Sequence, residues 1–444
     1  MTISRLPTVA FLPSFNDFGE TYPLIEIAKN YVQLGGRVIF IGFKGTYDHY
    51  ATDLGLPVIE LERHINEKIS ERNQRLEQKY HYQNMPQERI YPHLFSKENE
   101  ATSKERIEQE VSIFRREHVK LVVSAFNFTP LISARVAGVP LVTLVPGVAI
   151  PPYFESGLAT FPEGFENPVT RLVPKAVKNR LANWYIARCQ WSVKGFNRFA
   201  RMYGVPQVHR FLDLFCGDYT FLLDDMTFLR LKPTPRFPQE HFFGPLLPQY
   251  PSEGPKPSID SEVERQLQKP GRSILVTIGS YGVKQTFLKL LQTLNNTDYI
   301  VLVSLQSIIP EDELPSLHEN IIVRKFFPSI QRIHELADLS IIHGGRGTVY
   351  TAAFSGKPVI GIPMHAEQQW NLDNLLRYGT GVMVSKKYFT EQKLQAALQE
   401  IFTNYDMYLR NAERLKNTLP HPNATSLAAQ RIGDILSKEH DLRK

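Results

Sequence analysis

Cysteine is nearly absent from this 444-residue sequence, in which only Cys189 and Cys216 occur. Two cysteines exclude a disulfide framework and any zinc module built from several cysteines, and they fit a reducing cytoplasm. The sequence also has no Asp-x-Asp motif and no cluster of His or Cys at metal-ligand spacing. We therefore expect a cytoplasmic protein that has no metal site.

Long hydrophobic runs are missing as well. Pro13 interrupts the apolar residues Val9 to Leu12 early, and the most apolar stretch, residues 121–150, is broken by polar residues, glycine and proline. Neither stretch reaches the roughly 20 apolar residues of a membrane span, and the first is no secretion signal. We expect neither export nor a transmembrane anchor, and a peripheral contact with a membrane stays open.

Charge and composition are those of an ordinary globular protein. Hydrophobic residues make up 42% and charged residues 22%, and the net charge of +6 comes from Lys and Arg interleaved with Asp and Glu. Such a balance argues against disorder and against a basic stripe for nucleic acid. The expected partners are therefore small molecules, with no nucleic acid among them.

The first part of the chain has the pattern of a parallel α/β sheet. Residues 9–12 and 38–41 read as buried strands, and apolar residues at helical spacing lie between them: Leu24, Ile27, Ala28, Tyr31 and Leu34. Strand, helix, strand units place ligand sites in the loops after the strands, which here points to residues 13–22. Residues 60–120 read as solvated helices, and the aromatic, Pro-rich residues 151–174 as an irregular loop that could line an apolar cleft.

A second α/β unit follows a linker. Proline concentrates between residues 230 and 270, which places a boundary near residue 248. Beyond it, apolar segments at strand length recur between helix-length segments, at residues 274–278, 299–303, 321–323, 339–342 and 359–362. The predicted units are 1–248, 249–420 and a C-terminal helix or tail, 421–444, that packs back on the first domain.

The segment most suggestive of chemistry follows the strand at 339–342. It reads His343-Gly-Gly-Arg-Gly-Thr348 and opens a helix. Glycines let the backbone approach a ligand closely, and the exposed N–H groups of a helix start favour phosphate oxygens. The His343 and Thr348 side chains add further hydrogen-bond donors.

A second motif follows, Gly356-Lys-Pro-Val-Ile-Gly-Ile-Pro-Met-His-Ala-Glu-Gln-Gln-Trp-Asn371. Together the two segments resemble the donor-site signature of the UDP-glycosyltransferase superfamily, the family 1 glycosyltransferases. Phe243-Gly-Pro-Leu, Val276-Thr-Ile-Gly-Ser and Phe326-Phe-Pro support the resemblance, which is good over residues 240–385. It implies the GT-B architecture, with two Rossmann-like doubly wound domains facing a central cleft. The first domain would bind the acceptor and the second the nucleotide-sugar donor.

The resemblance also implies roles for individual residues. Phe326 would stack near the base, and Glu367 and Gln368 would contact hydroxyls of the donor sugar. The donor diphosphate would be held by Ser280, His343, Gly344, Gly345, Gly347 and Thr348. Arg346 is atypical in this turn, and pairing with phosphate or an outward, solvated position are both open.

Two departures bear on which nucleotide carries the sugar. Thr351 stands where many UDP-sugar enzymes have a glutamate that binds the ribose, and Ser329 replaces a common base-contacting glutamine. Both UDP- and dTDP-sugars therefore stay open, and dTDP gains weight.

The expected catalytic base is Glu20. Phe18-Gly-Glu-Thr-Tyr-Pro-Leu24 aligns with the family's Gly-His-x-x-Pro segment, in which the histidine is the usual general base. Residues 122–126 offer no aspartate to support a histidine, and a carboxylate base needs none. A glutamate that merely complements the helix dipole is the competing interpretation.

We thus predict a metal-independent, inverting hexosyltransferase without a cofactor beyond its nucleotide-sugar. It would act on a hydroxyl of an apolar natural product or lipid. The alternative is a glycosyltransferase-like helper protein that binds without catalysis. No Gly-x-Gly-x-x-Gly follows a strand and no Gly-Lys-Ser/Thr occurs, which disfavours dinucleotide oxidoreductases and P-loop NTPases.

Overall fold

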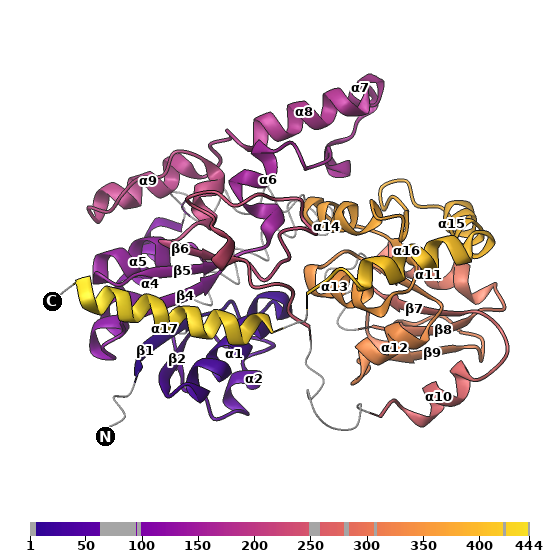
Figure 1. Ribbon diagram of the computed structural model, residues 1–444, viewed down its shortest axis with the longest axis horizontal. Helices are drawn as coiled ribbons and strands as arrows, with labels where there is room; N and C mark the ends of the chain where they lie inside the picture. Colours follow the sequence, from indigo (N-terminus) through magenta and orange to yellow (C-terminus); the bar gives the residue numbers. More distant parts are fainter. Residues whose placement is uncertain are drawn as a thin grey trace. The chain divides into compact units, whose positions relative to one another are not determined.

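The computed structural model describes residues 6–62, 95, 99–247, 258–278, 284–305, 309–420 and 423–442. They form two compact units (Figure 1). The first unit takes residues 1–159, 179–246 and 422–444, and the second takes residues 160–178 and 247–421. The expected boundary at residue 248 lies outside the described residues. Residues 160–178 group with the second unit, which a boundary based on sequence order alone does not anticipate.

The first unit is built on a sheet of six parallel strands in the order β3-β2-β1-β4-β5-β6. Its strands are β1 (Leu6–Leu12), β2 (Gly36–Gly42), β3 (Val58–Glu60), β4 (Leu121–Ala125), β5 (Leu141–Leu144) and β6 (Tyr219–Phe221). The chain adds strands on one side of β1 and then on the other. The switch point of this unit therefore lies between β1 and β4, where Leu12 pairs with Ser124.

The described residues of the first unit also form helices. They are α1 (Phe18–Gln33), α2 (His49–Thr52), α4 (Glu100–Arg116), α5 (Pro130–Ala137), α6 (Pro151–Glu155), α9 (Val193–Met202) and α17 (Ala424–Leu442), while α8 (Lys175–Ile186) spans the border of the two units. The last helix, α17, lies along α1 (Figure 1). Its Ala428 and Ile432 are fully buried in the same core as Leu24 and Ala28 of α1. The C-terminal helix is therefore part of the hydrophobic core of the first unit.

The second unit repeats the architecture, with strand order β12-β11-β10-β7-β8-β9. Its strands are β7 (Ser273–Thr277), β8 (Ile300–Ser304), β9 (Ile321–Arg324), β10 (Leu339–Ile342), β11 (Val359–Gly361) and β12 (Gly381–Met383). Its helices are α7 (Pro168–Leu172), α10 (Ser261–Leu267), α11 (Lys284–Asn295), α12 (Ile330–Leu336), α13 (Arg346–Ser355), α14 (Ala366–Leu376), α15 (Glu391–Thr403) and α16 (Tyr405–Lys416). Its switch point lies between β7 and β10.

The strands could be located from the sequence because they are buried on both faces and therefore form continuous apolar runs. β4, β5, β7, β8 and β10 are buried along their whole length, as expected for parallel strands covered by helices on both sides. Two doubly wound parallel α/β units confirm the predicted fold class.

Candidate functional site

The glycine-rich turn lies at the switch point of the second sheet. His343 directly follows β10, and its Nδ1 lies 3.3 Å from the carbonyl oxygen of Thr277 at the end of the neighbouring strand β7. In open α/β sheets, ligands bind outside the carboxyl ends of the strands at this point. The predicted phosphate-binding turn therefore occupies the position that the fold favours for a ligand.

His343 is a buried, neutral imidazole. Burial lowers the pKa of its ring to about 4, against the smaller opposing effect of the hydrogen bond to Thr277. A carbonyl oxygen can only accept, so the contact assigns the proton to Nδ1 and leaves Nε2 with its lone pair. A Cβ built on Gly345 would lie 2.6 Å from this Nε2. The imidazole thus packs directly under the glycine turn.

Each glycine of the turn meets a different physical requirement. Gly344 has φ +92°, and a Cβ there would lie 2.5 Å from the carbonyl oxygen of Gln368. Gly345 precedes α13 and gives the helix no side-chain cap, so the N–H groups of its first turn are available to a ligand. Gly347 lies in that first turn with nothing within 4 Å of a Cβ position. Room and donors for an anion therefore coincide, with the half-buried Thr348 next in the chain.

The start of α14 is tied to the same turn. Asn371 Nδ2 donates to the carbonyl oxygen of Gly344 at 3.1 Å and to Glu367 Oε1 at 3.2 Å. Gln368 is 3% exposed, and its Oε1 accepts from the backbone N–H of Met364 at 2.9 Å. This bond fixes the amide plane, so a sugar contact by Gln368 depends on its Nε2. Glu367 is half-buried, and its contact with the sugar stays a prediction.

Two basic side chains adjoin the site without having been assigned a role from the sequence. His365 directly precedes α14, and burial, followed by the nearby His343, lowers the pKa of its ring to about 3. Lys386 Nζ donates to the carbonyl oxygen of Met364 at 2.7 Å, and burial lowers the pKa of its ammonium group. His365 stands inside the second motif and could have been singled out, whereas no local pattern marks Lys386.

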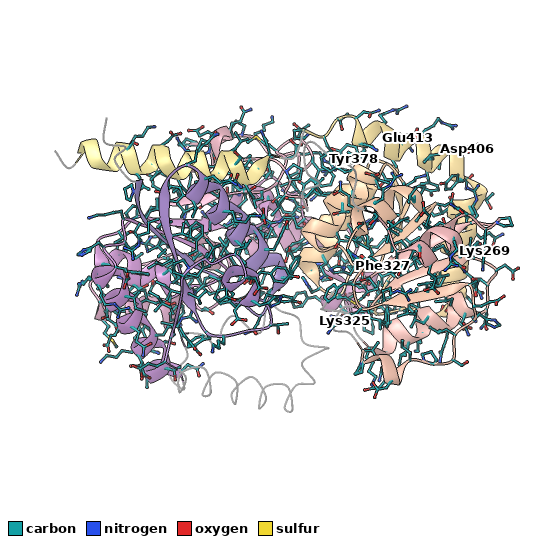
Figure 2. The ribbon with its side chains drawn as sticks, turned by 90° about the horizontal axis from the view of Figure 1, so that it is seen from below. Lys269, Lys325, Phe327, Tyr378, Asp406 and Glu413 are labelled. Carbon is teal, nitrogen blue, oxygen red and sulfur yellow. The ribbon has the colours of Figure 1, made fainter. Side chains whose placement is uncertain are left out.

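Two other residues were predicted from the sequence to bind the donor, Ser280 and Phe326. Ser280 belongs to residues that the structure does not describe. Phe326 follows β9 and is 52% exposed, while its neighbour Phe327 is buried within the second unit (Figure 2). An exposed ring of this size is suited to stack on a base.

The two unusual residues of the donor signature use their hydroxyls internally. Thr351 is buried, and its Oγ1 donates to the carbonyl oxygen of Gly347 at 2.8 Å, one turn earlier in α13. Ser329 Oγ donates to the carbonyl oxygen of Ser258 at 3.1 Å. Both hydroxyls thus already donate a hydrogen bond within the second unit.

An arm formed by residues 160–178 docks beside Glu367 and Gln368. Gln369 Nε2 donates to Thr160 Oγ1 at 2.7 Å, and Gln369 Oε1 accepts from the N–H of Glu163 at 2.8 Å. Trp370 Nε1 donates to the carbonyl oxygen of Thr160 at 2.9 Å, and Glu163 Oε1 accepts from Ser385 Oγ at 2.6 Å. Half of the loop expected to line an acceptor cleft in the first domain is thus fastened to the second unit.

Glu20 lies at the switch point of the first unit. It stands in the first turn of α1, where its N–H donates to Asp17 Oδ1 at 3.2 Å, and its side chain is half-buried. The loops after β1 and β4 each hold a non-glycine residue at positive φ, Phe15 at +57° and Phe126 at +45°. Strained backbone of this kind concentrates at functional sites.

Two buried hydroxyls flank the same switch point. Among the described residues, Thr21 Oγ1 and Ser124 Oγ have no hydrogen-bond partner. Buried hydroxyls usually have one, from the protein, a water or a ligand. Within the described ranges, no three His, Cys, Asp or Glu residues gather as metal ligands would, and no helix has the length and apolar content of a membrane span.

Comparisons with known proteins agree with this geometry. Residues 273–428 match the model of the glycosyltransferase family 28 C-terminal domain. The chain is 27% identical over 156 residues to the uncharacterized UDP-glucosyltransferase YojK of Bacillus subtilis, covering 35% of this chain and 38% of the relative. It is 25% identical over 188 residues to the NDP-glycosyltransferase YjiC of the same organism, covering 41% and 47%. The chain thus spans less than half the length of these curated relatives.

Solved structures match over nearly the whole chain. The calicheamicin glycosyltransferase CalG4 superposes with a TM-score of 0.65 at 15% identity, covering 98% of this chain and 99% of its own. The glycosyltransferase VinC, solved in complex with dTDP, superposes with a TM-score of 0.62 at 14% identity, covering 96% and 99%. Identities this low show the fold. Residues 273–428 thus match the glycosyltransferase family 28 C-terminal domain, and the chain has the two-domain GT-B fold of these solved structures.

Proposed function

We propose that the protein is a metal-independent, inverting hexosyltransferase that uses a UDP- or dTDP-sugar and needs no other cofactor. The observation that carries the proposal is the turn at the switch point of the second unit. A buried imidazole, an uncapped helix start and three glycines meet there. Such an arrangement suits a diphosphate, whose oxygens accept from backbone N–H groups and from the Thr348 hydroxyl.

In the proposed reaction, the acceptor hydroxyl attacks the anomeric carbon of the donor sugar as the bond from that carbon to the diphosphate breaks. Glu20 takes the proton of the hydroxyl, and the diphosphate leaves with the electron pair of the broken bond. The start of α13, His343, Thr348 and Ser280 stabilise the charge that develops on the leaving group. Attack opposite the leaving group inverts the configuration at the anomeric carbon.

The internal bond of Thr351 supports a deoxyribonucleotide carrier. A hydroxyl that already donates to Gly347 within α13 is a poor substitute for a carboxylate that binds both ribose hydroxyls. VinC, a structural neighbour, was solved with dTDP. We therefore expect dTDP to bind at least as tightly as UDP.

For the acceptor we propose an apolar natural product or lipid that carries a hydroxyl. Support comes from the aromatic, Pro-rich composition of residues 151–174 and from structural neighbours such as the calicheamicin glycosyltransferase. Apolar acceptors also accumulate in membranes, which is consistent with a cytoplasmic protein in peripheral membrane contact.

Calorimetric titration tests the donor site. UDP, dTDP and GDP would be titrated into the wild type, into His343→Ala and into the control His318→Ala, which changes an exposed histidine of the same unit. We expect dTDP to bind at least as tightly as UDP, with at least tenfold loss of affinity in His343→Ala and no loss in the control. Wild-type affinity in His343→Ala would contradict the assignment of the diphosphate site.

Transfer assays test the base. Glu20→Gln keeps the size of the side chain but removes the proton acceptor, so transfer should fall by about two orders of magnitude or more with nucleotide affinity unchanged. Glu60→Gln, an exposed carboxylate of the same unit, is the control. Transfer should also withstand a chelator. Tight nucleotide binding by the wild type without transfer to any acceptor would assign the helper role instead.

A further inference from the structure

One stretch of the chain has a charge composition unlike the rest. Residues 167–212 contain no Asp or Glu and carry nine cations: Arg171, Lys175, Lys178, Arg180, Arg188, Lys194, Arg198, Arg201 and Arg210. This excess is larger than the net charge of +6 of the whole chain. The local excess of positive charge is not apparent from the net charge of the chain, because acidic residues elsewhere partly offset it. We call residues 167–212 the acid-free segment.

Helix α8 of this segment presents apolar side chains to solvent. Val177, Leu181, Trp184 and Tyr185 follow the spacing i, i+4, i+7 and i+8, which places them on one helical face. All four are exposed, Leu181 and Trp184 to 57% each. Apolar side chains gathered this way mark an interaction surface rather than scattered exposure.

The opposite face of α8 is already in use. Ala182 and Asn183 are buried, and Asn183 exchanges two hydrogen bonds with the backbone of Ala159, from Nδ2 at 2.6 Å and to Oδ1 at 3.1 Å. These contacts fix the rotation of the helix, so its apolar side chains stay outside. The apolar face is therefore built into the fold and does not result from a loosely placed helix.

Cations border the apolar face. Arg180 is exposed next to it on the helical wheel. Arg188, two residues past the end of α8, stacks over Trp184 with its guanidinium carbon 5.6 Å from the ring centroid. Trp191 Nε1 donates to Tyr185 Oη at 3.1 Å and so links the end of α8 to the approach to α9. An apolar face edged by cations is typical of helices that lie in the interface of a membrane.

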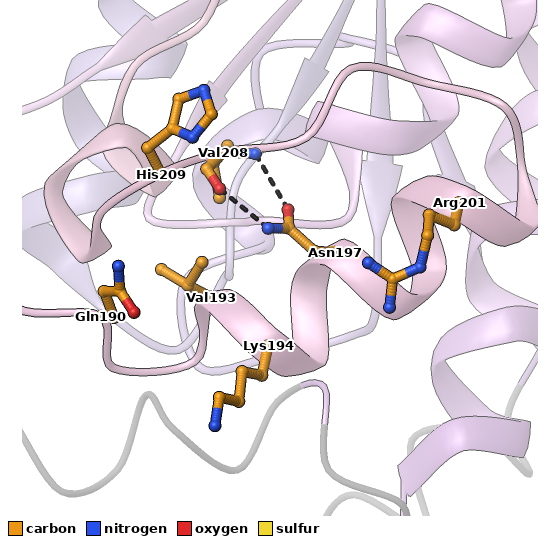
Figure 3. A pocket seen from close by; sticks show the side chains of 7 residues that line it. All are labelled: Gln190, Val193, Lys194, Asn197, Arg201, Val208 and His209. Carbon is orange, nitrogen blue, oxygen red and sulfur yellow. Dashed lines mark hydrogen bonds between the residues drawn. The ribbon is translucent and has the colours of Figure 1, made fainter.

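A pocket on α9 continues the same chemistry. It has a volume of about 390 Å³, and the exposed basic side chains of Lys194, Arg201 and His209 are among its lining residues (Figure 3). Asn197 holds the pocket together with two hydrogen bonds to the backbone of Val208 (Figure 3). The acid-free segment contributes every lining residue, so no carboxylate is among the lining residues in the described part of the chain.

We propose that the acid-free segment is a docking surface for the anionic face of a phospholipid bilayer. The apolar side chains of α8 would enter the interface, and Arg180, Arg188 and the cations of the α9 pocket would contact phosphate headgroups. Each Lys or Arg near an anionic leaflet strengthens such binding. The inference deepens the proposed function, because a lipid or membrane-dissolved acceptor would be met at this surface.

Vesicle binding of the full-length protein tests the proposal without any sugar transfer. The probes are vesicles of phosphatidylcholine alone and of equal parts phosphatidylcholine and phosphatidylglycerol. We expect sedimentation with the anionic vesicles only, weakening as salt is added. Leu181→Glu should lower the partition coefficient at least tenfold, while the control Leu54→Glu, which changes a leucine exposed to 50% in the first unit, should not.

The charge contribution has its own pair of variants. Arg180→Glu should weaken binding by about tenfold or more, and Lys269→Glu, an exposed lysine outside the segment, should have little effect. On vesicle binding the tryptophan emission should shift to the blue, and Trp184→Phe should remove most of that shift.

Three results would overturn the proposal: no binding to anionic vesicles, equal binding to both compositions, or binding that Leu181→Glu leaves intact. Self-association that Leu181→Glu abolishes, in the absence of vesicle binding, would assign the face to a second copy of the chain. Nucleotide titration of each variant keeps this test separate from that of the proposed function. Variants that bind nucleotide normally but not vesicles would support the docking surface even if no transferase activity were found.

Discussion

In the free protein, the neutral imidazole of His343 has no proton on Nε2 to donate to a phosphate oxygen. With Nδ1 bonded to Thr277 and a pKa lowered to about 4, the free protein turns a lone pair at Nε2 toward the glycine turn. Phosphate oxygens also bring lone pairs, so a direct contact requires a proton on Nε2. The negative charge of a diphosphate raises the pKa of a neighbouring imidazole. On binding, the imidazole can therefore take up this proton from the solvent.

We therefore predict that nucleotide diphosphate binding takes up a proton, approaching one per site. Affinity should then fall as the pH rises from about 4, the pKa of the free imidazole, and level off above the pKa of the bound-state imidazole. Calorimetry in buffers of different ionisation enthalpy measures the uptake, and His343→Gln should abolish it. Binding without proton uptake would mean that the imidazole changes tautomer and gives up its bond to Thr277.

Gly344 and Gly347 of the turn should respond differently to alanine. Gly344→Ala forces a side chain into φ +92° and against Gln368, so it should lower the free energy of unfolding by about 1–3 kcal/mol. Gly347→Ala meets nothing within 4 Å and should leave the fold as stable or raise its stability by up to about 1 kcal/mol. Thermal unfolding and nucleotide titration would be measured together.

The informative result is Gly347→Ala. If a phosphate group approaches the backbone there, the variant should lose nucleotide affinity while its stability is kept. Unchanged affinity in Gly347→Ala would place the phosphate elsewhere on the turn.

Sequence reasoning reached further at some residues than at others. The turn from His343 to Thr348 could be predicted because a local pattern, strand then glycines then helix, fixes its position at a sheet edge. Three features could not be predicted, because tertiary packing decides them. They are the hydrogen bond that the buried side chain of Gln368 accepts, the position of His365 near His343, and the position of Lys386 at the site. Lys386 reaches Met364 from 22 positions further along the chain.

At the scale of elements, helix α14 serves both the donor turn and the arm. Asn371 and Gln368 face the turn and the preceding loop, while Gln369 and Trp370 hold residues 160–163. The arm is thus hydrogen-bonded to the helix that carries Glu367. Release of the arm should therefore weaken donor binding.

Gln369→Ala removes three hydrogen bonds that hold the arm. We predict faster proteolysis within residues 160–178 and a higher Michaelis constant for the donor, with an unchanged melting temperature for the first unit. Limited proteolysis followed by mass mapping measures the first effect. Gln266→Ala, which alters a buried glutamine of α10 that donates to the carbonyl oxygen of Glu319, is the control. Cleavage at equal rates in both variants would refute a holding role for Gln369.

For the whole molecule, the distribution of buried histidines predicts an order of acid unfolding. Burial lowers the pKa of His334, His343 and His365 to about 3, 4 and 3, and all three belong to the second unit. Below about pH 6.5 the unfolded chain takes up protons that the folded unit cannot, so stability is lost as the pH falls. Each histidine contributes a slope of about 1.4 kcal/mol per pH unit. In the described part of the first unit, only His241 has a lowered histidine pKa.

Scanning calorimetry at decreasing pH checks this order. Two transitions should separate, with that of the second unit moving to lower temperature first. A first unit that melts earlier on acidification would contradict the prediction.

The whole-molecule architecture could be predicted from the sequence to a considerable extent. Fully buried strands give continuous apolar runs, and the five strands predicted for the second unit lie within one residue of β7 to β11. The short strand β12, with half-buried residues, gives no such run and was missed. The docking of residues 160–178 could not be predicted, because it depends on contacts more than 200 positions apart.

That docking has a consequence for recombination among related enzymes. The chain leaves the first unit at residue 159, returns at 179, leaves again after 246 and returns at 422. A chimaera joined at a single point near residue 248 would inherit its arm from one parent and the α14 surface that receives it from the other. To exchange donor preference between relatives, a chimaera would therefore have to take residues 160–178 and residues 247–421 from the same parent.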